Sequence, residues 1–198
     1  MKPFGNMTGI VLAGGRSSRF GADKAFAKLG GVPMIERALH TLRAIFGEWL
    51  VVTKTPELFC PDQARIVRDV GAWEGPLAGL YSGLLASSTE RNFVCACDMP
   101  WLSPALIRRL CRAANGWEAV IPRVGNHLEP LCAVYSRRCL PVVHDLLQEG
   151  KRGLADLAAR CSSKILPAAS LASRHHLRRA FLDLDTPEDL ARAERMAG

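Results

Sequence analysis

The sequence predicts a single α/β domain, a three-layer sandwich in which helices cover both faces of a mainly parallel, mixed sheet. Short runs of β-branched and apolar residues alternate along the chain with stretches in which apolar residues recur at helical spacing. No repeat, low-complexity segment or linker divides the 198 residues, so one domain spans 1–198. A glycine-rich segment follows the first expected strand, at the place where open α/β sheets bind ligands.

The expected elements follow in the order that this fold needs. Strands are expected at 9–12, 50–53, 66–68, 93–96, 119–121 and 131–135, because these short runs are apolar or β-branched. Helices are expected from 34 to 45 and from 77 to 85, where apolar residues recur at helical spacing. Ser103 before Pro104, and Thr186 before Pro187 with two acids behind it, each predict the start of a further helix.

The composition is that of an ordinary globular protein and excludes several classes. Hydrophobic residues make up 48% and charged residues 23%, enough to fill a core. No apolar run approaches the ~20 residues that a membrane span needs, and none of signal-peptide length precedes Gly14. The seven cysteines show no zinc-ligand spacing, and we expect Cys95 and Cys97 to be small buried hydrophobic residues. A reducing cytoplasmic location with no membrane partner is expected.

The net charge of +7 and the pI near 9.3 suit a polyanionic ligand or a nucleic acid. Aromatic residues are 7% of the chain and do not alternate with basic residues as they do in single-strand binders, so no nucleic-acid partner is expected. The one basic run, Arg174–Arg179, is either a solvated face or part of a funnel for an acceptor phosphate.

The segment Leu12–Lys24 carries the strongest signal for function. The adjacent Gly14 and Gly15 let the backbone turn sharply and approach a ligand, and their N–H groups can bind phosphate oxygens. Arg16, Arg19 and Lys24 bring cations to the same loop. The simpler interpretation is a glycine-rich turn with solvated basic residues.

Other glycine motifs do not match this segment. A P-loop needs four residues between its glycines and a Lys after the second, whereas five separate Gly15 from Gly21 and Ala22 follows. The Gly-x-Gly-x-x-Gly fingerprint is absent, and a nucleophile elbow would need glycine where Arg19 stands.

The segment, in the form Leu-Ala-Gly-Gly-x-Ser-x-Arg-Phe-Gly-x-Asp-Lys, resembles the signature of nucleotidyltransferases, in particular the molybdenum cofactor guanylyltransferases. The family usually has Met where Phe20 stands. The likeness continues in order over nearly the whole chain, through Asp69, Glu74–Gly79, Cys97–Leu102 and Asp185–Leu190. It implies a Rossmann-like fold of the nucleotide-diphospho-sugar transferase type, with 7–115 binding the nucleotide and 116–198 binding the acceptor.

The resemblance implies catalytic roles for Arg19, Lys24 and Asp98, with Asp98 as the ligand of a Mg²⁺ cofactor. Asp98 follows an apolar strand, and Mg²⁺ is usually held by one or two carboxylates plus phosphate oxygens. The alternative is a turn aspartate bonded to its own backbone. The implied nucleotide contacts are Leu12, Ala13, Gly14, Gly15, Lys24, Thr53, Asp69, Gly75, Pro76, Leu77 and Asp98.

Two departures from the family pattern leave the identity of the nucleotide base, guanine or cytosine, open. Thr53 stands where the guanylyl family often has Asn, and a hydroxyl replaces only part of an amide's hydrogen bonding. Asp183 and Asp185, implied in acceptor binding, stand where the family commonly has Asn and are closer to cytidylyltransferase relatives. Asp185 is either a ligand of a second Mg²⁺ or a capping residue.

The expected reaction is transfer of GMP from GTP to the phosphate of molybdopterin, with or without molybdenum, releasing pyrophosphate. The alternatives are a cytidylyltransferase or a sugar-phosphate nucleotidyltransferase on the same fold, or a non-catalytic nucleotide-binding protein. Arg123, His127, Glu129 and Pro130 lie in the half expected to receive the acceptor. The family also implies transient contact with proteins that deliver or accept the molybdenum cofactor.

Overall fold

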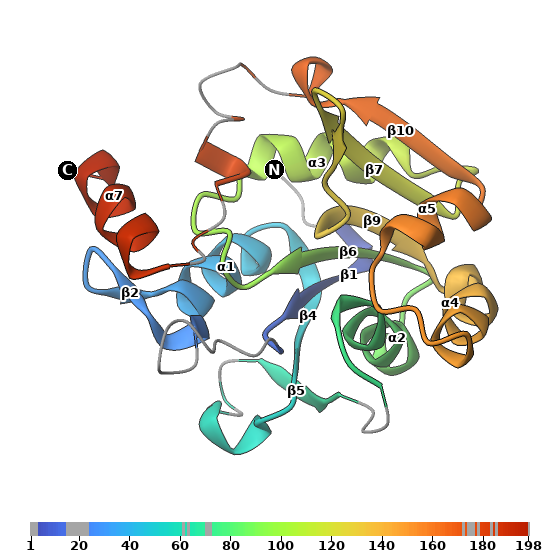
Figure 1. Ribbon diagram of the computed structural model, residues 1–198, viewed down its shortest axis with the longest axis horizontal. Helices are drawn as coiled ribbons and strands as arrows, with labels where there is room; N and C mark the ends of the chain where they lie inside the picture. Colours follow the sequence, from blue (N-terminus) through green and yellow to red (C-terminus); the bar gives the residue numbers. More distant parts are fainter. Residues whose placement is uncertain are drawn as a thin grey trace.

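The computed structural model describes residues 4–14, 24–60, 62, 64–69, 73–171, 173, 177, 179–182, 184 and 186–197. One mixed sheet runs through this part of the chain, with helices on both sides (Figure 1). The strands, in sheet order, are β10 (Ser163–Pro167), β7 (Ala119–Val124), β9 (Cys132–Ser136), β6 (Arg91–Ala96), β1 (Phe4–Leu12), β4 (Phe46–Thr53) and β5 (Arg65–Arg68). The short β8 (His127–Leu128) pairs with β7.

Parallel pairing in the middle of the sheet brings three strand ends together. β1 lies between β4 and β6, and Leu12 is in register with Val52 of β4 and with Ala96 of β6. Because the three strands run in the same direction, the segments after Leu12, Thr53 and Ala96 leave the sheet at one edge. β1 is buried from Met7 to Leu12, as a strand covered on both faces should be.

The other half of the sheet is mostly antiparallel. β9 pairs antiparallel with both β6 and β7, and β10 returns parallel to β7. The predicted mainly parallel, mixed sheet is confirmed, and every expected strand has a counterpart. The sequence analysis missed β10 and the two-residue strands β8, β2 (Lys28–Leu29) and β3 (Val32–Pro33), since such short runs show no periodicity.

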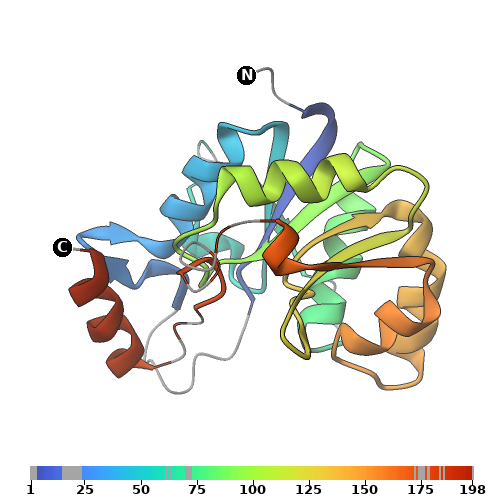
Figure 2. The same ribbon diagram turned by 90° about the horizontal axis from the view of Figure 1, so that it is seen from above.

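Helices cover both faces and complete three layers (Figure 1 and Figure 2). Val11 of β1 belongs to the apolar core beneath α1 (Met34–Arg43) and α3 (Pro104–Ala113). Its neighbours Ile10 and Leu12 belong to the core on the opposite face. The helices of that face are α2 (Pro76–Ala86), α4 (Leu140–Gln148) and α5 (Ala155–Arg160). Short 3₁₀ turns lie at Lys24–Phe26, Pro56–Leu58, Arg137–Cys139 and Ala168–Ser170.

The last helix, α7 (Pro187–Ala197), lies beside the β2–β3 hairpin at one side of the molecule (Figure 2). A small apolar cluster joins them, formed by Leu29, Met34, Leu184 and Ala193. The C-terminal end of the described chain is thereby attached to the segment that follows the glycine-rich loop in sequence.

Both predicted helix caps are confirmed. The Ser103 Oγ accepts a hydrogen bond from the Leu106 N–H, with Pro104 as the first residue of α3. At α7 the bonding is reciprocal, because the Thr186 hydroxyl accepts from the Asp189 N–H and the Asp189 carboxylate accepts from the Thr186 N–H.

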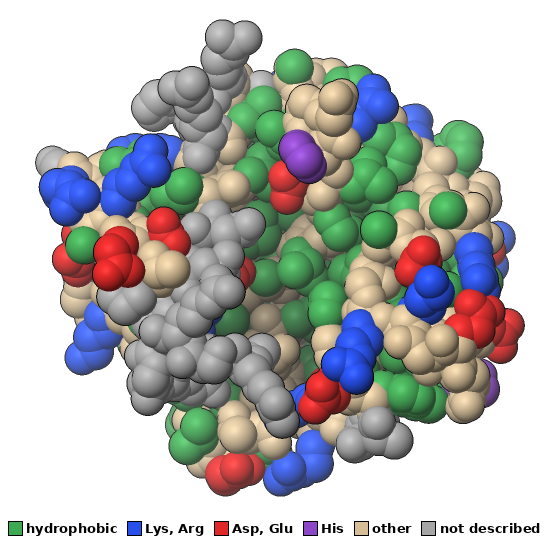
Figure 3. All heavy atoms as spheres, viewed as in Figure 1, with side chains coloured by type: hydrophobic (Ala, Val, Ile, Leu, Met, Phe, Trp, Pro, Cys, Tyr) green, Lys and Arg blue, Asp and Glu red, His purple; other side chains and the backbone are tan. Residues whose placement is uncertain are grey.

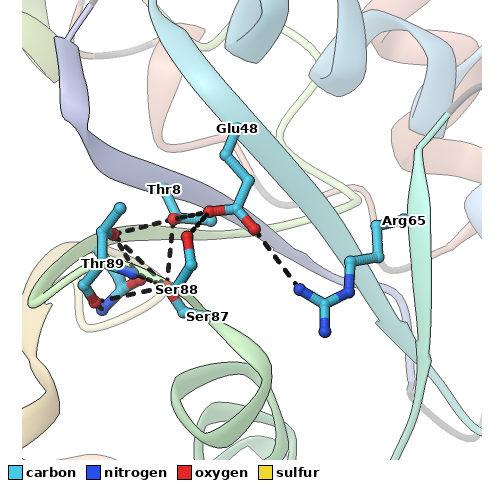
Figure 4. A network of polar contacts seen from close by, with 7 residues as sticks. Thr8, Glu48, Arg65, Ser87, Ser88 and Thr89 are labelled. Carbon is cyan, nitrogen blue, oxygen red and sulfur yellow. Dashed lines mark hydrogen bonds and ion pairs between the residues drawn. The ribbon is translucent and has the colours of Figure 1, made fainter.

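A network of hydrogen bonds joins Thr8 of β1 and Glu48 of β4 to the segment between α2 and β6 (Figure 4). The fully buried Thr8 hydroxyl bonds to the Glu48 carboxylate at 2.9 Å and lies 2.8 Å from the Thr89 hydroxyl. Glu48 also accepts from Ser88 and pairs with the exposed Arg65. This network satisfies a polar group inside the core, so we assign it a structural role.

Six of the seven cysteines are buried free thiols, and Cys60 is exposed. The expectation that Cys95 and Cys97 are buried is therefore confirmed. In the described part of the chain, no helix has both the length and the apolar character that crossing a membrane requires.

Candidate active site

The carboxyl edge of the central strands holds several of the residues that the sequence analysis singled out, among them Lys24, Thr53 and Asp98. The Ala13 N–H donates to Val52 O at 2.8 Å, and the Cys97 N–H donates to Leu12 O at 3.1 Å. These bonds continue the parallel pairing past the ends of the strands. The segments after β1, β4 and β6 are thus fixed side by side before any side chain is considered.

Asp98 and Lys24 form an ion pair at this edge. Lys24 Nζ lies 2.7 Å from Asp98 Oδ2, and the side chains are only 14% and 19% exposed. The pair joins the end of the glycine-rich segment to the turn after β6. A charge-assisted bond of this length in a partly desolvated place is strong. The structure therefore brings together two of the three residues with expected catalytic roles.

The second carboxylate oxygen of Asp98 is suited to a metal ion. Asp98 Oδ1 is buried and has no hydrogen-bond partner among the residues described. A buried carboxylate oxygen without a partner is costly, and a cation would remove that cost. Within the same described residues, no group of three His, Cys, Asp or Glu side chains could form a full ligand set. One carboxylate completed by substrate phosphates is the usual way in which Mg²⁺ is held.

Gly14 and Asp69 form the next part of the site. A Cβ on Gly14 would lie 3.9 Å from Lys54 N and 4.0 Å from Asp69 Oδ2, so this glycine faces the end of β4 and a carboxylate. Asp69 is 7% exposed, and its Oδ1 accepts a 2.6 Å hydrogen bond from Ser82 of α2. The sequence analysis did not single out Ser82, although a polar residue in so apolar a helix was a usable signal.

Thr53 is fully buried and shapes the turn after β4. Its hydroxyl accepts from the Thr55 N–H at 3.1 Å and lies 3.3 Å from the Thr55 hydroxyl. Its backbone oxygen accepts from the Asp69 N–H at 2.8 Å. Thr53 therefore links the ends of β4 and β5 beside the position of Gly14.

The start of α2 is held by a loop from the C-terminal half of the chain. Gly75 has φ +93°, and a Cβ there would lie 2.9 Å from Arg152 O. The same carbonyl accepts from the Leu77 N–H at 3.0 Å, and the Arg152 guanidinium lies 3.4 Å from Glu74. At the other wall, a Cβ on Gly79 would be 3.4 Å from Leu12. The helix that starts with Pro76 and Leu77 thus packs beside Leu12 at the carboxyl end of β1, and the backbone of Arg152 is a supporting contact that the sequence analysis missed.

Gly15, Arg19, Asp183 and Asp185 lie outside the described residues. From the basic run Arg174–Arg179, the described Arg179 places its guanidinium 5.8 Å from the Trp101 ring and donates to Met196 O. This member of the run is bound within the fold.

A separate pocket of about 630 Å³ opens on the C-terminal half of the sheet. Its lining includes the charged residues Arg123 and Glu129 and the apolar residues Pro167, Ala168, Leu177 and Phe181. In the space-filling view, this face of the molecule is hollowed over the central strands, hydrophobic side chains gather in the hollow, and charged side chains surround it (Figure 3).

Comparisons with known proteins agree with this geometry. Residues 9–165 match the family model described as a MobA-like NTP transferase domain. A protein of Desulfosudis oleivorans named molybdenum cofactor guanylyltransferase is 33% identical over 190 residues, covering 95% of this chain and 94% of that protein. This chain belongs to the molybdenum cofactor guanylyltransferase family.

A second relative of the family, from Pelotomaculum thermopropionicum and named "Probable molybdenum cofactor guanylyltransferase", is 34% identical over 96% of this chain and 93% of its own. The crystal structure of molybdopterin-guanine dinucleotide biosynthesis protein A from Archaeoglobus fulgidus superposes with a TM-score of 0.84 at 25% identity, covering 96% and 98% of the two chains. The fold is thus that of the nucleotide-diphospho-sugar transferases, and this member of the guanylyltransferase family is a nucleotidyltransferase.

Proposed function

We propose that this enzyme transfers GMP from GTP to the phosphate of molybdopterin, giving molybdopterin guanine dinucleotide and pyrophosphate. The Lys24–Asp98 pair carries the proposal, because it sets a cation and a half-satisfied carboxylate at the edge where the glycine-rich segment leaves β1. The relatives that share this chain's length are named for guanylyl transfer.

In this proposal Asp98 holds Mg²⁺ through Oδ1, the oxygen that Lys24 does not occupy. If Mg²⁺ were bound there, it would supply positive charge to offset the negative charge that develops on the phosphates during transfer. Lys24 neutralises the charge of Asp98 and of the triphosphate together. Arg19 is assigned to the triphosphate from the sequence pattern alone.

The chain's other groups bind and orient the nucleotide. The amides of Gly14 and Gly15 are assigned to phosphate oxygens, as in a glycine-rich turn after a strand. Ala13 is assigned to the nucleotide by the family pattern, since its own N–H already donates to Val52 O. The family pattern assigns Leu12, Pro76 and Leu77 to the base and the ribose, and Thr53 and Asp69 to the nucleoside. Leu77 and Thr53 are fully buried in the protein alone, so they support this wall of the site from beneath. Phosphoryl chemistry of this type depends on positioning and on charge neutralisation, and the acceptor phosphate is ionised near neutral pH. No protein nucleophile or general base is required.

The acceptor is assigned to the C-terminal half, residues 116–198, whose pocket of about 630 Å³ is of a size typical for small-molecule sites. Asp183 and Asp185 are assigned to the acceptor on the family pattern. Proteins that deliver or receive the cofactor would contact this half.

Pyrophosphate release with GTP, CTP, ATP and UTP in turn tests the proposal, with Mg²⁺ and molybdopterin present. We expect turnover with GTP alone, and loss of turnover when a chelator removes the metal. Turnover with CTP alone would instead assign the chain to cytidylyl transfer and give Thr53, Asp183 and Asp185 a role in base choice. No turnover with any of the four would contradict catalysis.

A further inference from the structure

Glu129 lies at the same edge of the sheet as the Lys24–Asp98 pair, although it is far from Asp98 in sequence. β6 and β9 are antiparallel, with Cys95 opposite Cys132. The Ala96 N–H donates to Leu131 O at 3.1 Å, which continues this pairing to the residue before the start of β9. Two more residues along each segment lead to Asp98 on one side and to Glu129 on the other. The antiparallel register therefore brings Glu129 to the edge that carries the Lys24–Asp98 pair.

The backbone around Glu129 is firmly held. Its N–H donates to Pro122 O at 2.9 Å, and its carbonyl accepts from the Cys132 N–H at 3.1 Å. The buried Tyr135 hydroxyl donates to the next carbonyl, that of Pro130, at 2.8 Å. These bonds fix the backbone of Glu129, and with it the direction in which its side chain leaves the chain, before a ligand arrives.

The half-buried Glu129 contributes an acidic wall to the C-terminal pocket, whose other walls are largely apolar. Pro167, Leu177 and Phe181 form apolar surface on which a flat ring can lie. A carboxylate here would repel the acceptor's phosphate, so the phosphate must point away from it, toward the cations of the nucleotide site. The pocket is thus suited to the uncharged ring of the acceptor.

We propose that Glu129 recognises the pterin ring of the acceptor by accepting hydrogen bonds from its 2-amino group and from its ring N3–H. These two donors point the same way and match the two oxygens of a carboxylate, as in other bidentate contacts between carboxylates and planar ligands. The exposed Arg123 on the same pocket suits the anionic sulfur groups of molybdopterin. This inference rests on the proposed function and adds which end of the acceptor is recognised and by which residue.

The test compares the binding of two ligands. One is 6-hydroxymethylpterin monophosphate, and the other is its 2-oxo counterpart, in which a carbonyl replaces the 2-amino group. A glutamate carboxylate should repel that carbonyl. We expect the full-length protein to bind the 2-amino compound at least about tenfold more tightly than the 2-oxo compound. This is near the lower end of the discrimination that a bidentate contact provides. Fluorescence titration of each compound, with Mg²⁺ and GTP-site occupancy held constant, gives the ratio of the two dissociation constants.

Glu129→Gln should abolish or reverse this ratio, because the glutamine amide can donate to the 2-oxo group. Glu129→Asp should keep the preference with weaker binding of both compounds. Glu149→Gln, the same change at an exposed residue paired with Arg160, should leave the ratio unchanged. Unchanged GTP affinity in each variant shows that the nucleotide site is folded.

The outcomes separate this inference from the function on which it rests. A wild-type preference that survives in Glu129→Gln overturns the assignment of Glu129 and leaves guanylyl transfer standing. A wild-type protein that binds GTP but neither pterin compound overturns the acceptor assignment, and the role of Glu129 with it.

Discussion

In the proposed mechanism Asp98 has two tasks: it pairs with Lys24 and it binds the metal ion. Its Oδ2 is neutralised by Lys24 at 2.7 Å, while its Oδ1 is buried with no hydrogen-bond partner in the described chain. Such an arrangement is unfavourable in the protein alone, since a buried lone carboxylate oxygen costs about 1–3 kcal/mol or more. It becomes favourable once a cation is present. This arrangement supports the proposed role of Asp98 in binding a metal ion.

Replacing Asp98 by Asn should separate these tasks. The amide keeps the shape of the side chain but removes the charge that both Lys24 and a divalent ion need. We expect kcat for pyrophosphate release to fall about 100-fold or more, as when a strong electrostatic contact in a transition state is lost. The melting temperature should fall moderately, because Lys24 loses its charged partner while the costly buried carboxylate oxygen is also removed. Asp145→Asn, an exposed acid on α4, serves as the control. Full turnover by Asp98→Asn would contradict the assigned role.

At the scale of elements, the start of α2 depends on a contact from the opposite half of the chain. Gly75 turns with φ +93° directly against Arg152 O, and this carbonyl accepts the hydrogen bond of the Leu77 N–H. The position of the start of α2, which is assigned to the proposed nucleotide site, therefore depends on the loop around Arg152. Nucleotide binding and the position of this loop should be coupled.

Gly75→Ala tests this coupling, and Gly116→Ala is its matched control. Both glycines have positive φ, +93° and +82°, so an alanine strains the backbone at either by about 1 kcal/mol or more. Only at Gly75 would the new Cβ meet another backbone atom, at 2.9 Å, whereas at Gly116 nothing lies within 4 Å. We expect both variants to melt at lower temperature, but only Gly75→Ala to raise KM for GTP. An equal effect on KM would place the cause in strain alone.

The sequence predicted the elements that depend on interactions between neighbouring residues, and it did not predict those that depend on contacts between distant segments. Local signals predicted β1 and the caps at Ser103 and Thr186, because each depends on neighbouring residues. The position of Asp98 after a buried strand predicted that it would lie at the carboxyl edge of the sheet. The contact of Arg152 with Gly75 and the place of β9 between β6 and β7 could not be predicted in this way. Both depend on pairing between distant segments, which leaves no periodic trace in the chain.

At the scale of the whole molecule, the core carries several ionisable groups that must stay neutral. Burial raises the pKa of the Cys111 thiol to about 12, with the nearby Arg108 acting in the opposite direction. Burial also raises the pKa of the Cys95 and Cys132 thiols and that of the Tyr135 hydroxyl. Three of these groups lie on the adjacent strands β6 and β9. Alkaline conditions therefore act on the core that supports the active-site edge.

The sign of the effect follows from proton binding. The unfolded chain loses each thiol proton near pH ~8.5, while the folded chain keeps the Cys111 proton up to about pH 12. Between these values the unfolded state binds fewer protons, so the free energy of unfolding falls as the pH rises. Below about pH 8 both states hold the proton, and these groups make stability independent of pH.

We therefore expect the free energy of unfolding, measured by urea titration, to decline above about pH 8.5, with each buried thiol adding up to about 1.4 kcal/mol per pH unit. Cys111→Ala should reduce this slope by close to the share of one thiol, even though it lowers stability at neutral pH through lost packing. Cys60→Ala, the same change at an exposed cysteine, is the matched control for this comparison. A Cys111→Ala variant with the wild-type slope would show that another group controls the alkaline limit of this fold.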